Sequence, residues 1–153
     1  MNSVLPNAGL PHNETEQSEP TAFARSPDDS AAPVILIVED DEDNRLMLRL
    51  MLEIWNYRVH EAKNGFEAIE VAKKENPNLI LMDVRMPRLD GFETARMMRR
   101  SDVVDGTPII FLSGCAQRFY RQIAFEAGGD EFLTKPVDFH LLETLLSRYT
   151  RSQ

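Results

Sequence analysis

Four short segments of the sequence carry side chains that could do chemistry together, and each directly follows a run rich in apolar residues. Glu39–Asp43 is a run of five consecutive acids, whereas Asp83, Ser113 and Lys135 stand at the ends of three other runs. Clustered carboxylate oxygens favour a hard divalent cation, and Mg²⁺ fits them best. An acceptor carboxylate, a metal ion, a hydroxyl and an ammonium are the groups that phosphoryl transfer needs. These residue types predict a phosphate-accepting site if the fold brings them together.

The elements that must position these residues alternate between strand and helix. Runs rich in aliphatic and β-branched residues predict buried strands, at residues 34–38, 57–62, 79–82, 108–112 and 131–134. Apolar residues at three-and-four spacing predict helices, at residues 42–55, 66–75, 92–100, 116–127 and around 141–149. Such alternation predicts an α/β fold with a parallel sheet and helices on both of its faces.

Apolar spacing also predicts which helix residues are buried. In the first helix the spaced apolar positions are Leu46, Met47, Leu50, Met51 and Ile54. We expect Met47, Met51, Met97 and Met98 to lie in the core.

The order of the strands determines which of the polar residues meet. In open parallel sheets, ligands bind beyond the carboxyl ends of the strands, where the strand order reverses. The flavodoxin-like order 2-1-3-4-5 places the first and third strands side by side, so Glu39–Asp40 and Asp83 converge there. Such crowding of carboxylates is unfavourable without a cation. Residues 41–43 are expected instead to begin the first helix, where acids interact favourably with its dipole.

Several motifs, in this order, resemble the receiver domain of two-component response regulators, in the stand-alone form related to chemotaxis regulators. The matching segments are Val38–Asp41, Leu81–Gly91, Phe111–Gly114 and Lys135–Pro136. The similarity covers residues 33–150, almost all of the part expected to fold.

The resemblance implies a phosphoacceptor and a Mg²⁺ site. Asp83 would accept a phosphoryl group from the phosphohistidine of a histidine kinase or phosphotransfer protein. Asp40 and Asp83 would bind Mg²⁺ directly, Glu39 largely through water, and Arg85 through its backbone carbonyl. Catalysis would be limited to the domain's own phosphorylation and dephosphorylation, so the chain is not expected to be an enzyme in the usual sense.

The resemblance also implies how phosphorylation becomes a signal. Ser113 would move toward the phosphoryl group, Lys135 would pair with a phosphoryl oxygen, and Phe132 is either a switch that turns inward or an ordinary core residue. Gly114 departs from the family, which usually has alanine there. The output would be an unknown protein acting in trans, with the domain a monomer or a phosphorylation-dependent dimer.

Composition limits the classes of partner and the compartment. The 153 residues carry a net charge of −8, which argues against direct nucleic-acid binding. No run of about 18 apolar residues predicts a membrane span, and the single Cys115 is consistent with the cytoplasm. Residues 1–32, acidic and rich in proline, are expected to be a disordered tail.

Three other functions compete with this interpretation. A phosphatase with an aspartate nucleophile would need a second aspartate two residues later, where the chain has Arg85. A flavin carrier of the same topology would need a hydroxyl-rich phosphate loop in place of Glu39–Asp43. A receiver that acts only as a constitutive interaction module, without phosphorylation, stays open.

Overall fold

The computed structural model describes Gly9 and residues 31–151 of the chain. Its strands are β1 Val34–Val38, β2 Arg58–Ala62, β3 Leu79–Asp83, β4 Ile109–Ser113 and β5 Glu131–Thr134. Its helices are α1 Glu42–Ile54, α2 Gly65–Glu75, α3 Gly91–Arg100, α4 Arg118–Glu126 and α5 Phe139–Thr150. Nearly all of the predicted tail, residues 1–32, lies outside the described residues. Among the described helices, none has the length and apolar character needed to cross a bilayer.

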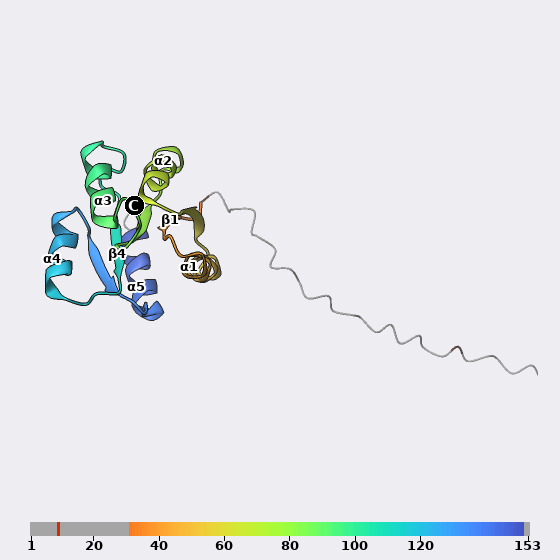
Figure 1. Cartoon of the computed structure of the whole chain (residues 1–153). Helices are drawn as coiled ribbons and strands as arrows, with labels where there is room; N and C mark the ends of the chain where they lie inside the picture. The colour runs from red at the N-terminus through yellow and green to blue at the C-terminus, as the bar shows by residue number, and fades with distance from the viewer. Residues whose placement is uncertain (1–8, 10–30, 152–153) are drawn as a thin grey trace, which may run out of the picture.

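The strands form one parallel sheet in the order β2-β1-β3-β4-β5, which confirms the predicted flavodoxin-like fold. Helices α2, α3 and α4 cover one face of this sheet, and α1 and α5 cover the other (Figure 1). In the register of β1 and β3, Val38 lies opposite Met82. The residues that follow, Glu39 and Asp83, therefore leave the sheet at the same edge.

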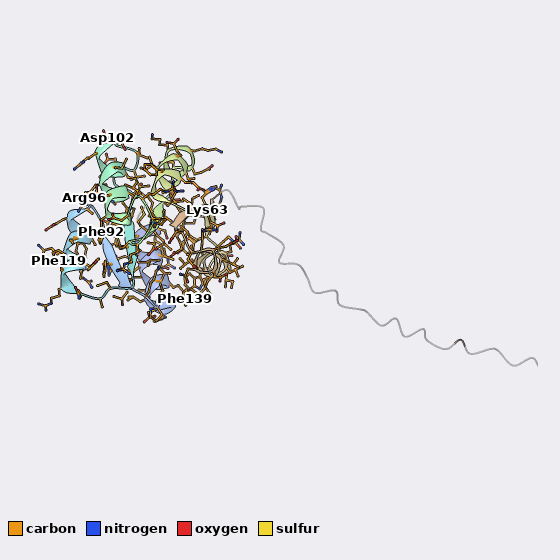
Figure 2. All side chains as sticks on the ribbon, in the orientation of Figure 1. Lys63, Phe92, Arg96, Asp102, Phe119 and Phe139 are labelled. Atoms are coloured by element: carbon orange, nitrogen blue, oxygen red, sulfur yellow. The ribbon has the colours of Figure 1, made fainter. Side chains whose placement is uncertain are left out.

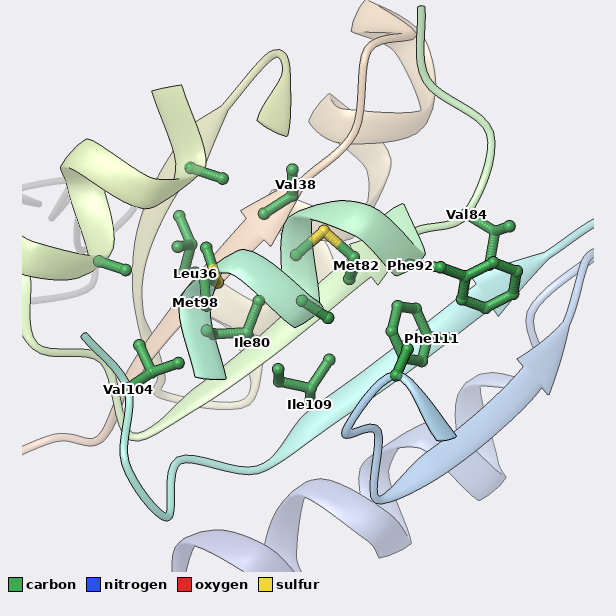
Figure 3. Close-up of a cluster of buried hydrophobic side chains, with 14 of the residues drawn as sticks. Leu36, Val38, Ile80, Met82, Val84, Phe92, Met98, Val104, Ile109 and Phe111 are labelled. Carbon is green, nitrogen blue, oxygen red and sulfur yellow. The ribbon is translucent and has the colours of Figure 1, made fainter. Parts of the chain in front are cut away.

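The core between the sheet and α3 holds the central strands in place. Figure 3 shows Ile80, Met82 and Phe111 of the sheet packed against Phe92 and Met98 of α3. The rings of Phe92 and Phe111 meet edge to face with centroids 5.1 Å apart. All residues of β3 and β4 are buried, so the positions at which these strands end are fixed by packing on both faces.

The predicted inward face of α1 is wrong. The helix buries Arg45, Leu48 and Leu52, and the last two pack against the sheet. Four apolar residues on its other side are 40–70% exposed, namely Leu46, Met47, Leu50 and Ile54, and we call them the α1 outer stripe. The helix thus carries two apolar stripes, and spacing alone does not decide which one meets the sheet.

Two further predictions about helices need correction. Met98 is fully buried, but Met97 is 39% exposed and lies outside the core. Helix α4 begins at Arg118 and not at Ala116. The backbone N–H of Cys115 donates to the hydroxyl of Ser113 at 3.1 Å, and this local bond turns the chain away from helical geometry.

The helix ends otherwise follow the sequence. Asp41 caps α1 by accepting a hydrogen bond from the N–H of Asn44 at 2.8 Å, with Glu42 and Asp43 in the first turn. This confirms that the later acids of the run begin a helix. Gly128, with φ of 100°, follows α4 in the left-handed conformation that glycine favours after a helix.

Candidate functional site

Three carboxylates meet at the carboxyl ends of β1 and β3. Glu39, Asp40 and Asp83 each offer one oxygen, and these oxygens lie within 4.8 Å of one another. Glu39 and Asp83 are only 1% and 4% exposed, whereas Asp40 is exposed to solvent. The site therefore has two carboxylates fixed in the protein and a third at its mouth, a donor set that suits a hard cation open to water and substrate.

The ammonium of Lys135 links the two buried acids. Its Nζ lies 2.8 Å from Oε2 of Glu39 and 3.0 Å from Oδ1 of Asp83. The sheet positions this lysine, because its backbone N–H donates to the carbonyl of Ser113 at 2.7 Å. Residues from the ends of β1, β3, β4 and β5 are thereby brought to one edge, as the sequence predicted.

The backbone and side chain of Glu39 are held by other groups. Its N–H donates to the carbonyl of Ala62 in β2 at 3.1 Å. Its Oε1 accepts from the N–H of Asp41 at 3.2 Å, and its carbonyl accepts from Nη1 of Arg45 at 3.0 Å. Arg45 was not among the predicted site residues, because in the sequence it resembles any solvent-facing base of a helix.

The remaining predicted site residues lie around this cluster. Ser113 ends β4 and is 4% exposed, with its hydroxyl engaged by the N–H of Cys115. Phe132 is 4% exposed and lies opposite Phe111 in the sheet, so in this conformation it is a core residue. Its movement stays a prediction. Arg85 follows β3 and is exposed.

A cavity of about 490 Å³ connects this edge of the sheet to solvent. Asp40, Arg85 and Asp90 supply polar groups to its wall. Its apolar wall comes from the segment after β3 and from α3 and α4, with Val84, Met86, Pro87, Phe92, Phe119, Tyr120 and Ile123. Phe119, labelled in Figure 2 on α4, is 66% exposed. A bulky phosphodonor thus has an open approach beside Asp40.

The acids are too crowded for Lys135 to balance their charge. Burial, together with the charge of Asp83, raises the pKa of Glu39 to about 7, although Lys135 opposes this. Burial also raises the pKa of Asp83. Burial disfavours the charge on Lys135 too, but its hydrogen bonds to Glu39 and Asp83 outweigh that effect and raise its pKa. An excess of negative charge among oxygen donors is what a bound divalent cation would relieve.

A pH dependence of stability follows for the metal-free protein. The folded state binds the Glu39 proton more tightly than the unfolded chain, in which a glutamate titrates near 4.5. Ionisation of Glu39 as the pH rises from about 4.5 through about 7 therefore destabilises the fold. The raised pKa of Lys135 adds no slope there, since both states keep that proton below about 10.

In EDTA, we expect the unfolding free energy of the wild type, relative to Glu39→Gln, to fall with pH. The expected fall is on the order of 1–2 kcal/mol between about pH 5 and pH 8. Urea denaturation across this range measures it, and the difference between the two proteins removes the contribution of titrating groups that do not interact with Glu39. A difference that rises with pH would contradict the assignment.

The fold and this edge define a small α/β module with a phosphoacceptor site. Residues 35–147 match the family model described as the response regulator receiver domain. The chain therefore belongs to the receiver domain family of two-component signalling, and it is a signalling module, not a conventional enzyme. The comparison confirms the resemblance on which the sequence analysis relied.

Two curated relatives extend the match. An uncharacterized 14.6 kDa protein of Leptolyngbya boryana is 40% identical over 115 residues, which cover 75% of this chain and 88% of the relative. The transcriptional regulatory protein ResD of Bacillus subtilis is 42% identical over 102 residues, which cover 67% of this chain. The match spans only 41% of ResD, less than half of its length.

Solved receiver structures resemble the model closely. The Vibrio cholerae chemotaxis protein CheY4 has a TM-score of 0.74 at 30% identity, with 78% of this chain and 99% of CheY4 covered. The receiver domain of Pseudomonas aeruginosa PA1611 has a TM-score of 0.72 at 33% identity over 78% of this chain and 98% of that one. That structure has a magnesium ion coordinated in its active site cleft.

A third structure contains a phosphotransfer partner. It is the co-crystal of the Saccharomyces cerevisiae histidine phosphotransfer protein Ypd1 with the receiver domain of Ssk1. The match has a TM-score of 0.73 at 29% identity and covers 78% of this chain and 89% of that one. Receiver domains are thus partners of proteins that carry phosphohistidine.

Proposed function

We propose that Asp83 accepts a phosphoryl group from the phosphohistidine of a histidine kinase or phosphotransfer protein, and that Mg²⁺ is required. The observation that carries this proposal is the contact of Asp83 with Lys135 inside a cluster of three carboxylates. A buried aspartate beside a fixed ammonium, with the exposed Asp40 lining a cavity next to it, is arranged as a nucleophile and not as a surface charge.

The chain's own residues have separate tasks in the transfer. An oxygen of Asp83 forms a bond to phosphorus as the phosphorus–nitrogen bond of the donor breaks, and the released imidazole takes up a proton. Lys135, already 3.0 Å from Asp83, pairs with an oxygen of the transferred group. Asp40 and Asp83 would hold Mg²⁺, with Glu39 acting mainly through water and the backbone carbonyl of Arg85 as a further ligand. When bound, Mg²⁺ neutralises charge that develops on the phosphoryl oxygens.

Phosphorylation is expected to change the surface formed by α4, β5 and α5. Ser113 turns from Cys115 toward the phosphoryl group, and the space it leaves lets the neighbouring β4 and β5 repack around Phe132. The change in α4, β5 and α5 is recognised by an output protein in trans, with the domain a monomer or a phosphorylation-dependent dimer. We place this exchange in the cytoplasm, where the thiol of Cys115 stays reduced.

Acetyl phosphate, a small phosphodonor, tests the proposed function directly. Incubated with acetyl phosphate and Mg²⁺, the protein is expected to gain the mass of one phosphoryl group, and EDTA is expected to prevent the gain. Intact-protein mass spectrometry measures both. If no Mg²⁺-dependent modification occurs, the phosphoacceptor role is wrong and a constitutive interaction module is the better description.

The α1 outer stripe is the surface on which we place the phosphodonor protein. Its four apolar residues lie along α1, which begins at Glu42, two residues after Asp40. A protein bound there would have its histidine close to Asp83. An amphipathic helix of the donor, packed on this stripe, fits its shape and apolar character. The Ypd1–Ssk1 complex supports the class of partner.

Leu50→Glu is expected to slow phosphotransfer from a phosphorylated histidine phosphotransfer protein by about tenfold or more, because a central apolar contact becomes charged. Phosphorylation by acetyl phosphate should stay unchanged, because it needs no docking. Phe125→Glu on α4 is the matched control, since Phe125 is 45% exposed and Leu50 is 49% exposed. Equal transfer rates for wild type, Leu50→Glu and Phe125→Glu would contradict the assignment of this surface.

A further inference from the structure

Arg45 is a charged residue in a core position. It lies in α1 on the face that also buries Leu48 and Leu52, and it is 8% exposed. Removal of a guanidinium from water is unfavourable unless hydrogen bonds and an opposite charge compensate for it. The partners of Arg45 therefore indicate what the residue does.

Those partners connect the residue that follows β1, Glu39, to β2, which is an edge strand of the sheet. Nη1 of Arg45 donates to the backbone carbonyl of Glu39 at 3.0 Å. Its Nε lies 3.4 Å from Oε1 of Glu61, a residue of β2. The next residue of that strand, Ala62, accepts the N–H of Glu39. The backbone of Glu39 is thus held at its N–H by β2 and at its carbonyl by a side chain that β2 orients.

The carbonyl of Glu39 belongs to the peptide that joins Glu39 to Asp40. Because a peptide group is planar, fixing this oxygen also fixes the direction in which the chain enters Asp40. The side chains on either side of this peptide are two of the three carboxylates in the site. We propose that Arg45 is a positioning residue for the metal site, which sets the geometry of the Glu39 and Asp40 carboxylates through the peptide between them. This inference rests on the proposed Mg²⁺-dependent function.

Charge and geometry predict opposite effects for loss of Arg45. As a positive charge near the site, Arg45 repels a cation, so its removal would strengthen Mg²⁺ binding. As a positioning residue it holds the ligands in place, so its removal weakens binding. Loss of a group that orients metal ligands typically lowers affinity about 10–100-fold. The sign of the change therefore separates the two roles.

Arg49 provides a matched control on the same helix. It lies one turn after Arg45, carries the same charge, and its Nη1 is 3.4 Å from the other oxygen of Glu61. In the described part of the chain Arg49 contacts Glu61, whereas Arg45 also bonds the backbone carbonyl of Glu39. Arg45→Met and Arg49→Met keep most of the apolar stem and remove one positive charge each.

The experiment measures Mg²⁺ affinity by calorimetry in the full chain, without phosphodonor. We expect Arg45→Met to bind Mg²⁺ about tenfold or more weakly than wild type, and Arg49→Met to bind within about twofold of it. In EDTA, amide hydrogen exchange at Glu39 and Asp41 should be faster in Arg45→Met only. Equal or tighter Mg²⁺ binding by Arg45→Met, or an equal loss in Arg49→Met, overturns the proposal.

Failure of this inference is distinguishable from failure of the proposed function. If wild type does not bind Mg²⁺, the function is wrong, and if wild type binds and Arg45→Met binds equally well, only the inference is wrong. Should Arg45→Met not fold, Arg45→Lys carries the test, because it keeps the positive charge but cannot hold the Glu39 carbonyl and Glu61 in the same geometry. A several-fold weaker Mg²⁺ affinity is expected, and an unchanged affinity overturns the proposal.

Discussion

Asp83→Asn is expected to abolish phosphorylation by acetyl phosphate and by any phosphohistidine donor. The amide has nearly the shape of the carboxylate but is a far weaker nucleophile, and it no longer offers an anionic ligand to Mg²⁺. The loss should exceed about 10³-fold in rate, since the attacking oxygen next to Lys135 is replaced by an amide. Intact mass after timed incubation with acetyl phosphate and Mg²⁺ measures it.

The fold of this variant should be retained. Burial raises the pKa of Asp83, so the ionised side chain is unfavourable in the metal-free protein. We therefore expect Asp83→Asn in EDTA to be as stable as wild type or more so at neutral pH, as urea denaturation can measure. Asp40→Asn is the companion variant, because it removes an exposed ligand but keeps the nucleophile, and slowed but measurable phosphorylation is expected. A normal rate of phosphorylation in Asp83→Asn would show that another residue is the acceptor.

Of the glycine-to-alanine substitutions near the site, Gly91→Ala is expected to reduce stability most. Gly91 begins α3, and its N–H donates to the carbonyl of Val84 at 2.9 Å. A Cβ on this residue would overlap the backbone oxygen of Asp83. Because β3 is buried on both faces, neither backbone can move easily. We expect a loss of about 3 kcal/mol in unfolding free energy, together with weaker Mg²⁺ binding because Asp83 is displaced.

Gly114→Ala is the matched control for this prediction. Gly114 lies in the loop after β4, at the same edge of the sheet, and a Cβ there meets nothing within 4 Å. We expect its unfolding free energy to stay within about 0.5 kcal/mol of wild type. Thermal or urea unfolding of both variants decides the matter. A similarly small loss in Gly91→Ala would mean that the start of α3 shifts readily, and that it does not hold Asp83.

The part of the site that lies at strand ends could be predicted from the sequence. Buried aliphatic runs are unambiguous strands, and the parallel topology then leaves little freedom in where Glu39, Asp83 and Ser113 emerge. The placement of Lys135 at this edge followed from the same argument, because it comes directly after the fifth strand, but its contacts with Glu39 and Asp83 were not predicted. The family motifs agreed with this geometry, and their order along the chain is specific.

The failures have a common physical cause, which is a choice that only tertiary packing makes. Helix α1 has two apolar stripes, and the pairing of Leu48 and Leu52 with the sheet was not encoded in spacing. A buried arginine such as Arg45 looks in the sequence like any solvent-facing base. The later start of α4 accompanies a bond from the Cys115 N–H to the Ser113 hydroxyl, which a helical pattern does not reveal.

The division of the helices between the two faces of the sheet has a kinetic consequence. Helix α1 packs on one face with α5, whereas α4 packs on the other with α2 and α3. A phosphodonor on the α1 outer stripe and a protein that contacts α4, rather than the α5 part of the proposed output surface, would therefore approach from different sides of the sheet. The two proteins could then be bound at the same time, so the output protein could bind before the donor has left. On the proposed placement of the two partners, the signal delay would be set by the repacking of the domain and not by the exchange of one partner for another.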